Sequence, residues 1–341
     1  MTLEEFKKKY QKAPVKEFPN NVEKELPEPM VSCRVSTYMH GDFIRQCLDG
    51  ILMQKTNFPF EILVGEDEST DGTREICLEY AKKHSSKIRL FLHSRENNIL
   101  IDGSPSSKFQ SRYTQYHCRG KYIAFCEGDD YWTDPYKLQK QVNFLEANPD
   151  YSMCFTDYTV INEAGKILKK SGMHPDAKKD YTHLDVLRRY TPKTLTSVFR
   201  RKALPVESLT KYRVVPNGDT FFFGIVTQFG SAKYIDEVTG AYRRHRGGIW
   251  SLISDVKKYA NQLKTYDVMW DNFKGDKQRK VLSKRIQESA SILFWKTANT
   301  SEFDTCHKLI FKSLIKTGNF SFWWQLNRKN GWRKIRPWKL L

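Results

Sequence analysis

Short apolar runs alternate with helical patterns from residue 31 to residue 157. In the segments between the runs, apolar residues repeat at helical spacing, as Phe43, Cys47 and Ile51 do after the first run. Strands separated by helices of about 10–15 residues form βαβ units, in which consecutive strands lie parallel. We therefore predict an α/β fold with a Rossmann-like, mainly parallel sheet flanked by helices. The expected strands are Val31–Val35, Phe60–Val64, Ile88–Leu92, Tyr122–Cys126 and Ser152–Asp157.

Composition divides the chain into three regions. Residues 1–29 are charged and contain prolines, so we expect an irregular N-terminal extension there. Residues 30–251 carry the alternation of strands and helices and would form the main domain. Residues 252–341 indicate a helical C-terminal appendage with a basic, aromatic tail. The length of 341 residues agrees with about two folding units of roughly 150 residues each.

The net charge of +18 is concentrated at the C-terminus. The last 37 residues hold nine Lys and Arg residues and no Asp or Glu, which is half of the excess. This distribution favours one basic surface over a protein that is basic throughout, and we expect no nucleic-acid partner. Seven cysteines without paired spacing indicate reduced thiols and a cytoplasmic protein. We expect neither a secretory signal nor a membrane-spanning segment, because no apolar run is long enough.

Acidic clusters follow two of the predicted strands, at Glu66–Thr73 and at Glu127–Asp130. In open α/β sheets, ligands bind beyond the carboxyl ends of the strands. Each cluster alone has a structural explanation, because Ser69 or Asp71 could cap the next helix and Asp130 could be a turn residue. Two clusters on neighbouring strands would bring several carboxylates together, which is costly unless a cation compensates them. Oxygen ligands of this kind suit Mg²⁺ or Mn²⁺ bound to a diphosphate.

Three ordered blocks resemble family 2 glycosyltransferases with the GT-A fold: Ser36–Tyr38, Glu66–Thr73 and Tyr122–Trp132. The likeness runs from about Val31 to Ser251, and three blocks at the family's separations make it specific. The resemblance implies an inverting, hexosyltransferase-type enzyme of bacterial polysaccharide or lipopolysaccharide synthesis. Such an enzyme moves a sugar from a nucleotide-diphosphate-sugar donor to an acceptor hydroxyl, here expected on a glycan or a lipid-linked saccharide.

The resemblance also assigns roles to the acidic residues. Asp67 matches the residue that recognises the nucleotide base. Glu127 and Asp129 occupy the family's Asp-x-Asp positions, with Asp129 the expected ligand of Mn²⁺ or Mg²⁺ and Glu127 expected near the ribose. Asp130 would shape the pocket for the donor sugar.

Ser36 and Thr37 lie at the end of the first strand, where the nucleotide also docks in the family. The loop from Arg95 to Arg112 could touch the donor as well, although solvated surface explains it equally. The sequence departs from the family pattern at two positions. Glu127 replaces the usual aspartate, and Arg34 interrupts a strand that is normally apolar throughout, without an explanation from the sequence.

The general base is expected in the second half of the chain. Pro216–Phe221 resembles the family block whose acidic residue deprotonates the acceptor, which makes Asp219 the predicted catalytic base. A base must come within hydrogen-bond reach of the acceptor hydroxyl, on the face opposite the departing diphosphate. The structural alternative is that Asp219 caps a helix, because it stands where an N-cap residue belongs.

A basic block, Tyr242–Ser251, resembles the Tyr-Arg-x-His-x-Gly-Gly segment that lies over the diphosphate in related bacterial transferases. We assign His245 to the metal or the leaving group, and Arg243 and Arg246 to the donor. Glycines beside Arg and His suit the capture of an anion. A solvated basic loop is the alternative.

Four of the eight tryptophans lie near the C-terminus among Lys and Arg residues: Trp323, Trp324, Trp332 and Trp338. Aromatic rings next to cations suit the surface of an anionic membrane. We therefore expect residues 305–341 to contact the inner face of the cell membrane peripherally. The alternative is that these tryptophans pack back on the catalytic domain as a terminal cap.

Two other classes of protein stay open. A nucleotidyltransferase that makes nucleotide-sugars would use a similar sheet, but it would need a Gly-rich loop with Lys or Arg after the first strand. The segment Ser36–Gly41 lacks such a loop. A non-catalytic protein that binds a surface through its basic tail is the second alternative, and loss of Asp129 and Asp219 would not impair its binding.

Overall fold

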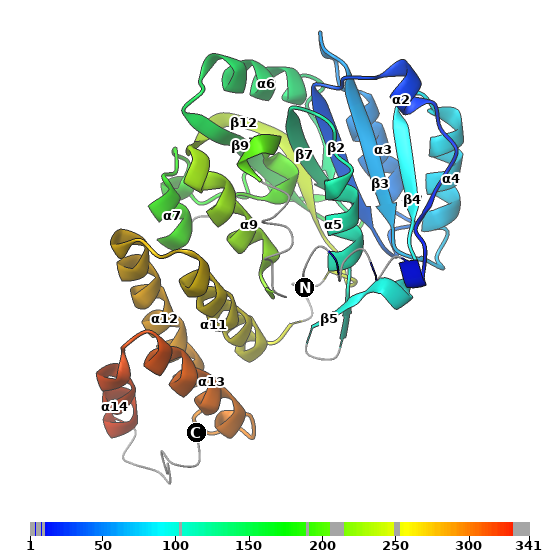
Figure 1. Cartoon of the computed structure of the whole chain (residues 1–341). Helices are drawn as coiled ribbons and strands as arrows, with labels where there is room; N and C mark the ends of the chain where they lie inside the picture. The colour runs from blue at the N-terminus through cyan, green and yellow to red at the C-terminus, as the bar shows by residue number, and fades with distance from the viewer. Residues whose placement is uncertain are drawn as a thin grey trace. The chain divides into compact units, whose positions relative to one another are not determined.

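The computed structural model describes residues 4, 8, 11–101, 104–188, 191–204, 215–248 and 253–329 (Figure 1). The chain divides into two compact units. The first comprises Met1–His183, Thr191–Val214 and Ile225–Arg246, and the second comprises Leu184–Tyr190, Val215–Gly224 and Gly247–Leu341. The second unit therefore combines segments from the middle of the chain with the C-terminal helices. The domain boundaries expected from composition, at residues 29 and 251, remain predictions.

Ten strands of the described residues form one sheet in the order β1-β4-β3-β2-β7-β11-β9-β12-β8, with β10 paired to β9. The strands β4, β3, β2 and β7 are parallel to one another, and β12 is parallel to β9. The other pairs are antiparallel and lie at β11 and at the edges. The predicted α/β fold is confirmed, with a mixed sheet whose long central ladders are parallel. The strands are β1 (Lys16–Glu17), β2 (Val31–Thr37), β3 (Phe60–Glu66), β4 (Ile88–Leu92), β7 (Tyr122–Glu127), β8 (Tyr131–Trp132), β9 (Tyr151–Asn162), β10 (Ile167–Lys169), β11 (Val198–Arg200) and β12 (Ser231–Arg244), and a separate hairpin of β5 (Ile99–Ile101) and β6 (Ser104–Ser106).

Helices cover both faces of this sheet. The apolar cluster on one face is built from β2, β3 and β7 together with α3, α4 and α6, while α5 places Gln110 and Thr114 against Gly65 on the other face. The helices of the first unit are α2 (Val22–Glu25), α3 (Ile44–Leu52), α4 (Thr73–Lys83), α5 (Lys108–Tyr116) and α6 (Lys137–Ala147).

β2 is buried along its whole length, as a central parallel strand requires. Val31, Cys33 and Val35 belong to the apolar cluster that α3 covers. The helix contributes apolar residues at helical spacing, which gives it one buried face. These residues are Ile44, Cys47, Leu48 and Ile51.

The strand order reverses at β2. The chain runs from β2 to β3 and β4 on one side and then returns to pair β7 with the other side of β2. Ser36 lies opposite Glu127, and Thr37 lies opposite Glu66, so three strands end side by side. A reversal of this kind leaves a crevice beyond the carboxyl ends of the strands, where ligands of α/β sheets bind.

The residues predicted as an irregular extension include an edge strand. β1 pairs antiparallel with β4, and Glu17 accepts from Arg89 with a distance of 2.8 Å. The next element, α2, buries Val22 completely. The sequence did not indicate this strand, because two charged residues show no hydrophobic alternation.

The second unit is helical. Its aromatic contacts bury Trp323, whose ring lies 5.1 Å from that of Phe311 and 5.7 Å from that of His307. Trp324 stays 36% exposed, and Trp332 and Trp338 lie outside the described residues. Of the described tryptophans of the tail, Trp323 therefore packs within its own unit, and both membrane contact and packing on the catalytic domain stay predictions. The helices are α7 (His183–Arg188), α9 (Gly218–Val226), α11 (Asp255–Asn272), α12 (Asp276–Thr297), α13 (Phe303–Lys316) and α14 (Phe320–Lys329), of which α7 and α9 each extend into the first unit.

All seven cysteines are free and buried, in agreement with the expected reduced thiols. Across the described residues, none of the helices combines the length and the apolar character needed to cross a lipid bilayer.

Gly50 tests the close contact between α3 and β8. Helix propensity alone favours alanine over glycine by about 1 kcal/mol. Packing opposes this preference, because a Cβ at residue 50 would lie 2.8 Å from the carbonyl oxygen of Trp132 and 2.9 Å from its nitrogen. We expect Gly50→Ala to lower the free energy of unfolding by about 1–3 kcal/mol, measured by chemical denaturation. Equal or higher stability of the variant would contradict this packing.

Candidate active site

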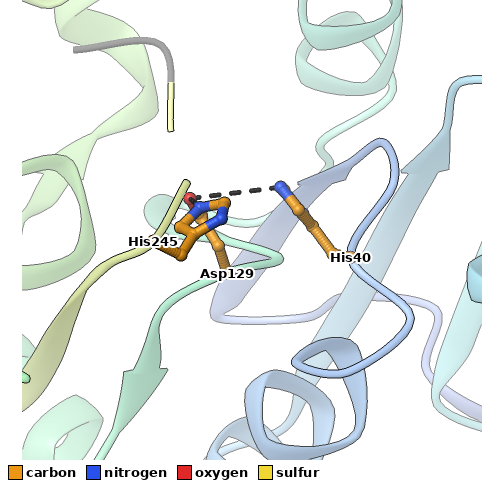
Figure 2. Close-up of side chains that lie close together, drawn as sticks. All are labelled: His40, Asp129 and His245. Carbon is orange, nitrogen blue, oxygen red and sulfur yellow. Dashed lines mark hydrogen bonds and ion pairs between the residues drawn. The ribbon is translucent and has the colours of Figure 1, made fainter. Parts of the chain in front are cut away.

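Two histidines and an aspartate meet beyond the carboxyl ends of β2, β7 and β12. His245 Nε2 lies 3.1 Å from Asp129 Oδ2, and His40 Nε2 lies 4.0 Å from the same oxygen. Figure 2 shows the three side chains close together, with a dashed line between Asp129 and His40. One ligand atom from each residue lies within 4.8 Å of the others, which is close enough for all three to hold one cation. The predicted metal residues Asp129 and His245 are thus neighbours, and the structure adds His40.

The turn after β7 positions Asp129. Gly128 N donates to Ser36 O at 2.9 Å, so the turn is anchored on the end of β2. A Cβ on Gly128 would lie 2.6 Å from Thr37 Oγ1 and 2.8 Å from His40 Nδ1. Only glycine allows this approach without displacing the neighbouring side chains. The glycine between the two acidic positions therefore brings Asp129 next to His40.

The loop after β2 positions His40. Three consecutive backbone N–H groups of this loop donate to side chains of the acidic block that follows β3. The pairs are Met39 with Ser69 (3.0 Å), His40 with Thr73 (2.8 Å) and Gly41 with Asp71 (2.9 Å). Asp71 Oδ1 also accepts from Thr73 N at 3.2 Å, at the start of α4. Part of the acidic block is therefore structural, as the capping alternative proposed, and it supports the His40 loop.

Arg243 and Asp130 join the end of β12 to the turn after β7. Asp130 Oδ1 accepts from Arg243 N at 2.8 Å, and Arg243 Nε donates to Asp129 O at 3.0 Å. The other guanidinium nitrogens of Arg243 donate to the carbonyl of Glu163 (3.0 Å) and to the side chain of Gln46. Arg243 is buried, and its guanidinium is engaged by the protein itself. Together these bonds fix the segment that carries His245.

The two adjacent aspartates have opposite pKa shifts. Burial would raise the pKa of Asp129, but the hydrogen bond with His245 and the charge of His40 outweigh it and lower the pKa below its usual value. Burial raises the pKa of Asp130 well above its usual value, and the negative charge of Asp129 adds to this effect. Asp129 is therefore the carboxylate that stays ionised and available to a cation.

Arg34 has a structural partner that the sequence did not reveal. The buried guanidinium donates to Glu127 Oε1 at 2.8 Å and to Ser36 Oγ at 2.6 Å. It also stacks on the ring of Phe125, with 3.9 Å from Cζ to the ring centroid. The arginine thus supplies the positive charge that Glu127 needs beside two other acids, and the longer arm of Glu127 reaches it.

Asp67 is buried directly after the end of β3. Its side chain is 1% exposed, and Oδ2 accepts from Arg95 at 3.0 Å and from Asn98 at 3.3 Å. Burial raises the pKa of Asp67 to about 6, although Asn98 and Arg95 act in the opposite direction. Oδ1 is buried and has no hydrogen-bond partner among the residues that the structure describes. The guanidinium of Arg95, which pairs with Asp67, lies over the ring of Tyr38, with 3.9 Å from Cζ to the ring centroid.

Most of the predicted site residues lie at this edge of the first unit. Ser36 and Thr37 are buried, with Ser36 bonded to Arg34 and Thr37 Oγ1 lying 3.2 Å from His40 Nδ1. Arg246 is exposed, one residue after His245. Asp219 lies in the second unit, in the first turn of α9, where Oδ1 accepts from Thr220 N at 2.8 Å. Its role as the base stays a prediction.

Sequence reasoning missed His40 as a site residue. A histidine three positions after the end of a central strand is a signal that was available, because strand ends carry the ligands in this kind of sheet. Its partner residues come from two other strands, so the sequence alone could not indicate what it faces.

Comparisons with known proteins agree with this geometry. The model of glycosyl transferase family 2 matches residues 32–101. An uncharacterized protein of Mycobacterium tuberculosis strain H37Rv is 33% identical over 253 residues, which cover 72% of this chain and 69% of the relative. The putative teichuronic acid biosynthesis glycosyltransferase TuaG of Bacillus subtilis is 26% identical over 175 residues, covering 51% of this chain and 64% of TuaG.

Solved structures show the same fold. TarS of S. aureus, residues 1–349 in complex with UDP-GlcNAc, matches with a TM-score of 0.62 and 15% identity over 89% of this chain and 93% of TarS 1–349. The mannosyltransferase PcManGT of Pyrobaculum calidifontis, in complex with GDP-Man and Mn²⁺, matches with a TM-score of 0.52 and 15% identity, covering 98% of this chain and 95% of PcManGT. The chain belongs to glycosyl transferase family 2 and is a nucleotide-sugar-dependent glycosyltransferase.

Replacing Arg34 tests the paired charges of the site. Arg34→Met removes the partner of Glu127, so we expect it to lower the free energy of unfolding by about 2–4 kcal/mol in urea denaturation. Arg45→Met is the matched control, because Arg45 pairs with Glu79 at 2.7 Å on the exposed surface. Such ion pairs on the surface contribute little to the free energy of unfolding. Equal losses in the two variants would contradict a special role of Arg34.

Proposed function

We propose that the protein is an inverting glycosyltransferase that uses Mn²⁺ or Mg²⁺ and moves a sugar from a nucleotide-diphosphate-sugar to an acceptor hydroxyl. The grouping of Asp129 with His245 supports the metal, because imidazole and carboxylate groups at the end of a strand provide a suitable donor set. Asp67, whose Oδ1 has no hydrogen-bond partner in the described part of the chain, lies two strands away along the same edge of the sheet.

The nucleotide base would bind at Asp67. Oδ1, which has no hydrogen-bond partner among the described residues, can accept a base N–H, and the face of the Tyr38 ring that Arg95 does not cover would offer a surface for stacking. Ser36 and Thr37 then line the path from the base toward the diphosphate, and Glu127 would lie near the ribose. Solved relatives of the same fold contain UDP-GlcNAc in one case and GDP-Man in another, which is consistent with a nucleotide-sugar donor.

The cation would be held by Asp129 and His245. When bound, it neutralises the charge that develops on the departing diphosphate. Asp130 would border the donor sugar, while Arg243 would position the segment of His245 rather than touch the donor. Arg246 is exposed and would reach the donor phosphates.

Asp219 would take the proton of the acceptor hydroxyl. Attack from the face opposite the diphosphate inverts the anomeric centre, and a single positioned carboxylate suffices for this step. Asp219 is partly exposed, and its only described side-chain hydrogen bond is to the adjacent Thr220 N–H, so one oxygen remains for an acceptor.

A glycan or a lipid-linked saccharide is the proposed acceptor, in line with the name of the relative TuaG. Peripheral contact with an anionic membrane through residues 305–341 would bring the enzyme to a lipid-linked acceptor. In the described part of this segment, Ile315, Phe320 and Trp324 are exposed apolar residues, and Lys308 and Lys312 are exposed cations. Apolar side chains next to cations suit such a surface.

A donor-hydrolysis screen tests the proposal. Incubation with a panel of nucleotide-sugars, with and without Mn²⁺, should release nucleoside diphosphate from one or two donors only when the cation is present. Asp129→Asn should abolish the release of nucleoside diphosphate that the cation supports. Asp219→Asn should lower kcat of transfer to an acceptor by about 10²–10⁴-fold with little change in the donor KM.

Asp176→Asn is the control, because Asp176 is an exposed acid of the first unit outside the site. Absence of turnover with every donor, in a folded protein, would count against the assignment. Consumption of nucleoside triphosphate with release of pyrophosphate would instead identify a nucleotidyltransferase.

Donor binding should depend on pH through Asp67. Since burial raises the pKa of this carboxyl to about 6, it is ionised above pH 6 and becomes protonated as the pH falls through 6. The protonated carboxyl accepts a base N–H less well, so the donor KM should rise below pH 6. Asp67→Asn should raise KM at pH 7.5 and flatten this dependence, measured by initial rates between pH 5 and 8. An identical profile in the variant would contradict the role of Asp67.

A further inference from the structure

We propose that His40 is a third protein ligand of the cation, and that the enzyme therefore holds its cation before the nucleotide binds. The inference rests on the proposed cation site at Asp129 and His245 and adds a residue to it. The third ligand bears on whether the cation or the nucleotide binds first and on which metal is preferred. A site made of Asp129 and His245 alone leaves both questions open.

Two of the separations in this cluster are close to those of ligands that share one ion. Ligands about 2.1 Å from a cation lie about 3.0 Å apart in adjacent octahedral positions and about 4.2 Å apart in opposite ones. His245 Nε2 and His40 Nε2 lie 3.1 Å and 4.0 Å from Asp129 Oδ2, and all three ligand atoms lie within 4.8 Å of one another. The 4.8 Å limit exceeds the separation of opposite ligands, so we infer that a ring rotates when the three atoms gather around one ion.

His40 is oriented for this role. Thr37 Oγ1 lies 3.2 Å from His40 Nδ1, so the hydrogen bond uses one ring nitrogen and leaves Nε2 directed at Asp129 (Figure 2). Metal-binding histidines commonly bond their second nitrogen to a protein group, which fixes the tautomer and the ring. An imidazole that served only to pair with Asp129 would not need this second contact.

The backbone that carries His40 is fixed before any ligand arrives. The N–H groups of Met39, His40 and Gly41 each donate to a side chain of the block after β3. Gly128 leaves the space in which the ring sits, since a Cβ there would approach His40 Nδ1 to 2.8 Å. Ligands held in this way lose little conformational freedom when the ion binds, which favours binding to the free protein.

The number of ligands decides the order of binding. A cation held by one or two carboxylates depends on substrate phosphates for the rest of its coordination. Three protein ligands can hold the ion alone and leave positions open for diphosphate oxygens and water. Two imidazoles also shift the preference away from Mg²⁺, which favours oxygen ligands, and toward Mn²⁺ and later transition metals.

Titration of the metal-free protein with Mn²⁺ in the absence of nucleotide tests this inference, with unbound Mn²⁺ followed by electron paramagnetic resonance. We expect one Mn²⁺ site per chain, and we expect Mg²⁺ to displace the bound Mn²⁺ poorly. His40→Ala should bind Mn²⁺ at least about 10-fold more weakly, and added UDP or GDP should reduce the difference, because phosphate oxygens replace the lost ligand. His174→Ala is the matched control, since His174 is an exposed histidine outside the site.

Two outcomes overturn the inference: Mn²⁺ binding by the wild-type protein only when a nucleoside diphosphate is present, or equal affinity of His40→Ala and wild type. If His40→Ala does not fold, as judged by circular dichroism, pulsed electron paramagnetic resonance of Mn²⁺ in the wild-type protein decides. Two coordinated imidazole nitrogens support His40 as a ligand, and one excludes it. These readouts need no sugar transfer, so a protein that binds Mn²⁺ in this way but hydrolyses no donor would contradict the proposed function alone.

Discussion

The bond between the backbone N–H of Arg243 and the carboxylate of Asp130 is the interaction on which the site depends most. It joins residues that are 113 positions apart in sequence, at the ends of β12 and of the turn after β7. The bond from Arg243 Nε to Asp129 O reinforces it. Since His245 follows Arg243 by two residues, this pair of bonds sets its distance from Asp129. The ladder with β9 supports β12 as far as Arg244, and these two bonds add the link to the turn that carries Asp129.

Buried charge is the main cost of this arrangement. Asp67, Asp130 and Arg34 are each less than 5% exposed, and charged groups of this kind destabilise a fold unless they are paired. The protein meets the cost in different ways: Arg34 pairs with Glu127, whereas burial raises the pKa of Asp67 and of Asp130. The fold is therefore less stable than it would be with apolar residues at these positions, but it keeps polar groups at the edge of the sheet where a ligand can bind.

The same sequence pattern served two purposes, which limited what could be predicted from it. The acidic residues after β3 were candidates for both binding and capping, and they divide accordingly. Asp67 keeps one buried oxygen without a partner among the described residues, while Asp71 accepts from the backbone N–H groups of Gly41 and of Thr73. Arg243 was expected at the donor, yet its guanidinium donates to groups of the protein. Residue type and spacing cannot separate these roles, because the partner of each side chain comes from another strand.

The sequence by itself determined the α/β fold, the position of the acidic residues at the strand ends and the family of the enzyme. These features are local: apolar runs, helical spacing and short motifs each depend on residues that are close in the chain. Only the tertiary structure decided that His40 meets Asp129 and His245, and that Arg34 neutralises Glu127. Such contacts join the ends of different strands, and their geometry follows from the strand order and register, which pairwise spacing in a single sequence does not specify.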